Sequence, residues 1–141
     1  MLHFEVSWLP LVVIAVANFF LSWVYYSPAV PWFKTWGDAV GFDPNKREMT
    51  EAEKKAMPFM MGGALVASFL LSYGLQVFVN SMGAKDFSAG LLVGIAAWVT
   101  FSITHSLNTL FEGRKPVVLV INNVLYLITY AVFGGIVAIW K

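Results

Sequence analysis

Four long uncharged stretches dominate the pattern of polar and hydrophobic positions along this chain. Asp, Glu, Lys and Arg are absent from residues 6–33, 56–84, 87–111 and 116–140. Each stretch is longer than the ~20 mostly apolar residues that a helix needs to cross a bilayer, and none has the ~10-residue alternating segments of a transmembrane barrel. The pattern therefore predicts four transmembrane helices, at approximately residues 8–26, 57–78, 87–111 and 117–140.

The composition extends this interpretation. Of the 141 residues, 59% are hydrophobic and 12% charged, whereas a soluble domain has about 45–50% and 25%. These values exclude a soluble enzyme, a nucleic-acid-binding protein and a disordered tail. No segment outside the four stretches is long enough to bury a core of its own. We therefore expect residues 1–141 to form a single all-α membrane domain, a four-helix transmembrane bundle surrounded by lipid.

Basic residues are distributed unevenly between the predicted loops. Of nine Lys and Arg residues, only Lys85 and Lys141 lie on the side of the termini. The other seven lie in the first and third loops: Lys34, Lys46, Arg47, Lys54, Lys55, Arg114 and Lys115. Because cytoplasmic loops carry the excess of basic residues, we predict that both termini lie outside and that these two loops are cytoplasmic.

The first loop has a helical pattern of its own. Its apolar residues recur at helical spacing, with Lys34 and Asp38 outside the stripe that they form: Trp32, Phe33, Trp36 and Val40. This pattern is typical of a short amphipathic helix in the membrane interface, although a groove on a soluble partner fits it too. Further along, Thr50 and Glu53 form a T-x-x-E capping box, which predicts a helix that continues into the second transmembrane stretch.

Several uncharged polar residues lie at a similar depth inside the predicted helices. Asn18, His105 and Asn122 are each seven or eight residues from the cytoplasmic end of their stretch, or ~10–12 Å along a helix. Gly62 and Gly63 of the second stretch fall at the same depth. We therefore expect one layer to which all four helices contribute. Tyr126 shares a helix face with Asn122, and the neighbouring candidates Asn108 and Asn123 lie beside these faces.

Two interpretations of this layer remain open. The polar residues could line a cavity open to the cytoplasm, in which His105 binds a proton or a polar solute. Since four helices are few to enclose a pathway, this interpretation favours small-solute or proton transport by a homo-oligomer. Alternatively, the polar residues join the helices through hydrogen bonds worth ~0.6–2 kcal/mol each, which favours a non-catalytic accessory or scaffold subunit of a membrane complex.

The chain offers few groups for catalysis or for binding a cofactor. It has no cysteine, and His3 and His105 are its two histidines, far apart in sequence. Disulfides, thiolate chemistry and Cys-ligated metals are therefore excluded, and we expect no metal, no cofactor and no enzymatic activity. Glu112 and Arg114 are candidates for a site at the inner mouth, but they equally fit a turn that carries positive-inside charges.

Glycine is concentrated in the outer halves of the helices and in the turns. Gly90 and Gly94 form a G-x-x-x-G motif, which lets helix backbones approach closely. This spacing predicts a tight, dry seal but leaves open whether its partner is a neighbouring helix or a second subunit. Other glycines of that half are Gly74, Gly134 and Gly135, and tight turns are predicted at Gly83 and Gly113.

Three segments resemble a family of small bacterial four-helix membrane proteins known as a domain of unknown function. They are Tyr25-Tyr26-Ser27-Pro28 with Phe33-Lys34-Thr35-Trp36 and Gly41-Phe42, Leu110-Phe111-Glu112-Gly113-Arg114, and the Asn123-x-x-Tyr126 pair within Ile121–Tyr126. The chain departs from the family pattern at Leu127, where the family has histidine. The resemblance covers nearly the whole chain and implies a bacterial inner-membrane location. It implies no activity.

Overall fold

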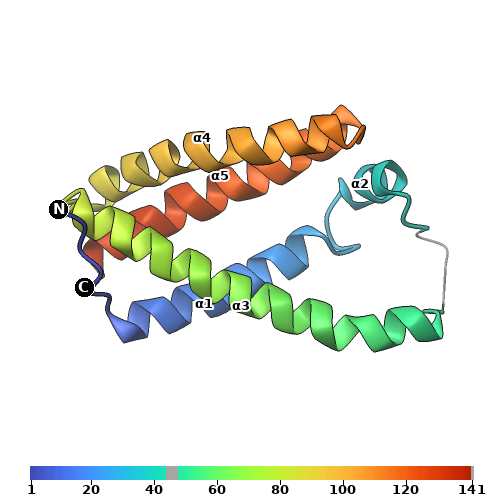
Figure 1. Ribbon diagram of the computed structural model, residues 1–141, viewed down its shortest axis with the longest axis horizontal. Helices are drawn as coiled ribbons and strands as arrows, with labels where there is room; N and C mark the ends of the chain where they lie inside the picture. Colours follow the sequence, from blue (N-terminus) through green and yellow to red (C-terminus); the bar gives the residue numbers. More distant parts are fainter. Residues whose placement is uncertain (44–47, 141) are drawn as a thin grey trace.

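The computed structural model describes residues 1–43 and 48–140, and within these residues it is all-helical, with no strand. Its five helices, coloured along the chain in Figure 1, are α1 (Trp8–Tyr25), α2 (Phe33–Val40), α3 (Glu51–Ser81), α4 (Phe87–Phe111) and α5 (Pro116–Ile139). All but α2 are long and apolar enough to cross a membrane. The all-α class and the four long helices are thus confirmed, whereas their sidedness stays a prediction. The predicted sidedness depends on the positions of the basic residues, and three of these, Lys46, Arg47 and Lys141, lie outside the described residues.

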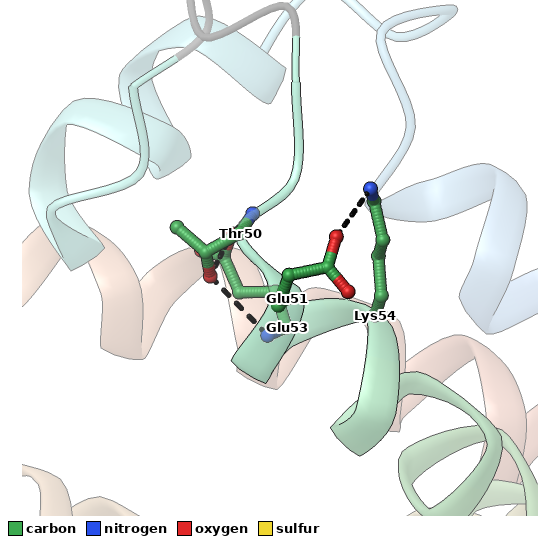
Figure 2. A network of polar contacts seen from close by, with 4 residues as sticks. All are labelled: Thr50, Glu51, Glu53 and Lys54. Carbon is green, nitrogen blue, oxygen red and sulfur yellow. Dashed lines mark hydrogen bonds and ion pairs between the residues drawn. The ribbon is translucent and has the colours of Figure 1, made fainter.

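The predicted capping box begins α3, as Figure 2 shows. The Glu53 backbone N–H donates to Thr50 Oγ1 at 3.2 Å, and the Thr50 backbone N–H donates to Glu53 Oε2 at 2.7 Å. Lys54 Nζ donates to Glu51 Oε1 at 2.8 Å on the next turn. The cap therefore sets the start of α3 before the predicted membrane span. Its 31 residues are roughly 46 Å long, which exceeds the ~30 Å of bilayer hydrocarbon.

The two predicted glycine turns are confirmed. Gly83 and Gly113 have φ of +69° and +68°, a left-handed conformation that glycine adopts without the steric cost of a Cβ. Beyond Gly113, the Arg114 N–H donates to the Thr109 carbonyl at 3.2 Å, and α5 begins at Pro116. These short turns hold α3, α4 and α5 as antiparallel neighbours.

The four long helices form two pairs (Figure 1). Helices α4 and α5 lie side by side along their length, while α1 crosses α3. We call the end where α1 begins and α5 ends the terminal end, and the end with α2 and the α4–α5 turn the loop end. Helix α3 lies close to the α4–α5 pair at the terminal end and diverges from it toward the loop end, whereas the end of α1 stays against α5 there.

Glycines bring the backbones of α4 and α5 together near the terminal end. A Cβ added at Gly90 or Gly94 would overlap the carbonyl oxygens of Gly134 and Tyr130. The G-x-x-x-G motif therefore faces a neighbouring helix of the same chain, which resolves the alternative left open above. Gly74, however, has no atom within 4 Å of an added Cβ, so its predicted part in the seal is wrong.

Helix α2 packs against the end of α1. The ring of Trp32 lies 4.7 Å from that of Tyr25, and the ring of Trp36 lies 4.9 Å from that of Tyr26, between centroids. Trp32 Nε1–H also donates to the Tyr25 carbonyl at 3.0 Å. A helix in the first loop is therefore confirmed, and its tryptophans contact the protein itself. Its location in the membrane interface stays a prediction.

The first half of α3 is not covered by the other described residues. Every residue from 51 to 67 is exposed, and no atom lies within 4 Å of a Cβ added at Gly62 or Gly63. The expectation that these glycines contribute to the polar layer is therefore wrong. The physical reason is the crossing of α1 and α3, which carries this half of α3 away from α5 (Figure 1).

Two glycines in membrane-spanning helices allow a matched test of the α4–α5 contact. Gly94→Ala introduces a methyl group where backbone already lies, and overpacking of this kind costs about 1–3 kcal/mol. Gly74→Ala gains the same helix propensity as Gly94→Ala, but its methyl group meets no neighbouring helix. We expect Gly94→Ala to lower the free energy of unfolding in detergent and Gly74→Ala to leave it unchanged or raise it. Equal stabilities of the two variants would contradict the close contact.

Candidate functional site

Asn18 joins three helices through its side-chain amide. Its Nδ2 donates to Ser68 Oγ of α3 at 2.9 Å, and its Oδ1 accepts from Thr129 Oγ1 of α5 at 3.2 Å. All three side chains are buried. The donor and the acceptor of this amide are both used inside the protein, so its role is to join helices. This agrees with the interpretation in which the polar residues connect the helices through hydrogen bonds.

The contact between α1 and α3 continues toward the terminal end as a polar seam that our sequence analysis missed. Ser72 Oγ donates to the Leu11 carbonyl at 2.9 Å. Gln76 Oε1 accepts from the Ser7 N–H at 3.0 Å, and Gln76 Nε2 donates to the Ser7 carbonyl at 3.4 Å. The sequence does contain a pattern that could have predicted this seam. Polar residues recur at every fourth position of α3 and so form one stripe along the helix: Ser68, Ser72, Gln76 and Asn80.

Asn122 pairs with the tyrosine that follows α1. Tyr26 Oη–H donates to Asn122 Oδ1 at 2.7 Å, and Tyr25 Oη–H donates to the Ile121 carbonyl at 2.9 Å. Burial, with smaller contributions from Tyr126 and Tyr25, raises the pKa of the Tyr26 hydroxyl well above its ordinary value. The hydroxyl therefore keeps its proton and remains a donor to Asn122.

Asn123 binds to α4 on another face of α5. Its Nδ2 donates to Ser106 Oγ at 3.0 Å and to the Leu119 carbonyl at 2.9 Å. Trp98 Nε1–H donates to the Asn123 carbonyl at 3.1 Å. The two adjacent asparagines of α5 therefore serve different neighbours, because successive residues of a helix point about 100° apart.

His105 contacts Tyr126 rather than the asparagines. The two rings meet edge to face with centroids 5.1 Å apart. His105 Nε2 is buried and has no hydrogen-bond partner among the described residues. One turn away, Phe101 stacks on Tyr130 at 6.0 Å between centroids. A buried histidine nitrogen without a partner among the described residues distinguishes His105 from the hydrogen-bonded asparagines.

The candidates at the loop end are exposed. Arg114 Nε donates to Glu112 Oε2 at 2.6 Å, and each of these side chains is 54% exposed. Asn108 is exposed as well. This arrangement fits the simpler interpretation, a turn whose charges pair at the surface.

The predicted layer is thus divided into separate contacts. Asn18 binds Ser68 and Thr129, Asn122 binds Tyr26, and the remaining candidates contact other neighbours. Three hollows in the described part of the chain are lined by other residues than Asn18, His105, Asn122 and Tyr126. Within one subunit, these four residues therefore do not share one of those cavities.

Comparison with known proteins assigns the chain to a family. The sequence model described as "Protein of unknown function (DUF1761)" matches residues 9–138, which cover all but the terminal residues of the four long helices. The chain belongs to the DUF1761 family. No curated protein and no solved structure matches it.

The motifs that suggested the family cluster at the loop end of this DUF1761 protein. Tyr25 and Tyr26 contact Trp32 and Trp36 of the same motif region, and both tyrosines bind α5. The Leu110–Arg114 segment forms the α4–α5 turn. These motif residues thus hold the loop end together, where α1, α2 and α5 meet.

The Asn18 contact can be tested by a double-mutant cycle with Thr129. We expect Asn18→Ala to lower the free energy of unfolding by about 1–2 kcal/mol, because it leaves buried hydroxyls without a partner. The effects of Asn18→Ala and Thr129→Ala should be non-additive, since both remove the same bond. Asn108→Ala, at an exposed amide, serves as the control and should be neutral. Additive effects would exclude the bridge.

Proposed function

We propose that this DUF1761 protein is a non-catalytic subunit of a membrane assembly and that it associates with a second copy of itself through the uncovered half of α3. The observation that carries this proposal is the exposure of every residue from 51 to 67. We place the assembly in the bacterial inner membrane as a multi-pass protein; the four long apolar helices support a membrane location.

The polar residues support an assembly role over a pathway through one subunit. Asn18, Asn122 and Asn123 each donate or accept hydrogen bonds that join separate segments of the chain. Binding of a polar solute at these amides would have to break those bonds. The side chains that were candidates for a pathway therefore stabilise the subunit, and its interactions occur at its surface.

The uncovered half of α3 fits a second copy better than it fits one subunit alone. Copies with the same orientation in one membrane place identical residues opposite each other across a two-fold axis. Ala56, Met60, Gly63 and Ala67 lie on one face of α3 at spacings of four, three and four. Small residues on such a face let two helices approach closely. Met60 is the largest side chain on this face, so it can pack between the small ones.

Cross-linking of single cysteines tests this interface, because the chain has no cysteine of its own. Met60 and Leu92 have equal exposure, 65% each, so Met60→Cys and Leu92→Cys differ in location rather than in accessibility. We expect oxidation in membranes to convert most of the Met60→Cys protein to a disulfide-linked dimer and to leave Leu92→Cys monomeric. Denaturing electrophoresis without reductant measures both.

A second control lies on α3 itself. Leu65 is on the face opposite Met60 and is 38% exposed, so Leu65→Cys should cross-link much less than Met60→Cys. Equal cross-linking at all three positions would indicate random collision in the membrane. Absence of cross-linking at Met60, together with a monomeric mass in mild detergent, would indicate that lipid alone covers α3.

Small-solute or proton permeation is the second candidate function, and His105 favours it. Its buried Nε2 has no partner within the described residues, and an ionisable group inside a membrane helix is costly to keep there without a role. In an assembly of several copies, a neighbouring subunit would supply the additional walls that a pathway past His105 and Tyr126 needs.

Proton flux into proteoliposomes tests this candidate. If His105 relays protons, His105→Ala should reduce the flux to that of empty liposomes, whereas His3→Ala, at an exposed position near the terminal end, should leave it unchanged. A pH-sensitive dye inside the vesicles reports the flux. A parent protein that gives no more flux than empty liposomes would exclude permeation and leave the assembly role intact.

A further inference from the structure

A hollow of about 520 Å³ lies along the α4–α5 pair, and it is lined by these two helices alone. Its walls are mostly branched aliphatic side chains, such as Val99, Ile103 and Val124, with Trp98 among the lining residues. The hollow is separate from the contacts of Asn18 and from the uncovered half of α3. Ligand binding in this hollow is therefore independent of the assembly role.

Polar groups interrupt this apolar lining in one place. Ser102, Ser106 and Asn123 all line the hollow. Ser106 Oγ accepts from Asn123 Nδ2, as described above, which fixes the amide. Ser102 is only 6% exposed, and its Oγ has no hydrogen-bond partner among the described residues. A buried hydroxyl beside the hollow is therefore left unsatisfied, which is costly in an apolar environment.

The depth of Ser102 limits which molecule could bind this hydroxyl. Ser102 precedes Glu112 at the loop end by ten residues, or ~15 Å along a helix, which is about half of the ~30 Å hydrocarbon thickness. The ester carbonyls of phospholipids lie near the headgroups and do not reach this depth. A molecule dissolved in the hydrocarbon layer does.

The charge and hydrogen-bonding character of the lining narrow the chemistry further. No Asp, Glu, Lys or Arg occurs in α4 or α5, so a fatty acid carboxylate would find no counter-ion along these two helices. The hydroxyl of Ser102 offers a donor, which matches a carbonyl oxygen. Trp98 supplies a flat aromatic surface at one end of the hollow. An uncharged ring with a carbonyl at its edge satisfies all three properties.

We propose that the α4–α5 hollow binds a lipid-soluble carbonyl compound of the quinone class, with the Ser102 hydroxyl donating to its carbonyl oxygen. The apolar walls hold the body of the molecule, and Trp98 contacts its ring. The site takes up its ligand sideways from the bilayer, since both the ligand and the hollow lie within the hydrocarbon layer. Binding requires no covalent or redox step.

Quenching of tryptophan fluorescence tests this site in the full-length protein. A decyl-substituted benzoquinone is titrated into nanodiscs of fixed lipid composition that contain the protein. We expect a saturable component of quenching that disappears in Trp98→Phe. Ser102→Ala should weaken binding by about tenfold, which corresponds to 1.4 kcal/mol. Ser88→Ala, at an exposed serine of the same helix, is the matched control and should bind like the parent.

A variant that fills the hollow and a competitor without carbonyl groups distinguish binding in the hollow from partitioning into lipid. Val124→Phe fills part of the hollow without adding a tryptophan and should abolish the saturable component even if Ser102→Ala perturbs packing. Decylbenzene, which lacks the carbonyl groups, should fail to compete with the quinone. Quenching that rises linearly with the quinone would reflect partitioning into lipid and overturn the proposal. So would equal competition by decylbenzene, or unchanged affinity in Ser102→Ala.

Discussion

An amide side chain surrounded by hydrocarbon must find its hydrogen-bond partners within the protein, and the fold depends on how Asn18 meets this constraint. Its donor binds Ser68 and its acceptor binds Thr129, so one side chain connects α1, α3 and α5. Apolar packing alone would join these helices weakly, because lipid chains offer the same dispersion contacts. The amide makes the contact between the two helix pairs specific.

The two pairs are held by different interactions, which explains their different shapes. Gly90 and Gly94 let the backbones of α4 and α5 touch, so that pair stays together along its length. The pair of α1 and α3 is held by side chains from Ser68 to the terminal end, through Ser72 and Gln76. Before Ser68, α3 has exposed residues only. The divergence of α3 thus begins where its polar stripe ends.

The sequence predicted the lengths of the helices better than the contacts between them. Hydrocarbon thickness limits the length of an uncharged stretch, and the predicted span 87–111 coincides with α4. The start of α3 at Glu51 depends on a backbone cap, which hydropathy does not report but the Thr50–Glu53 motif does. Depth, by contrast, is a single coordinate. It placed Asn18 and Asn122 in one layer, whereas their directions around the helix axes give them different partners.

The hydrogen bonds of the polar residues separate the satisfied parts of the molecule from the unsatisfied ones. Asn18 uses both its donor and its acceptor, whereas Ser102 Oγ and His105 Nε2 have no partner in the described part of the chain. Both unsatisfied groups lie on α4 beyond Gly94, on the side of the loop end. Selection for packing alone would favour apolar side chains at such positions, because an unpaired polar atom costs free energy in hydrocarbon. The loop half of α4, with the uncovered half of α3 opposite, is therefore where this structure has capacity for a ligand or a partner.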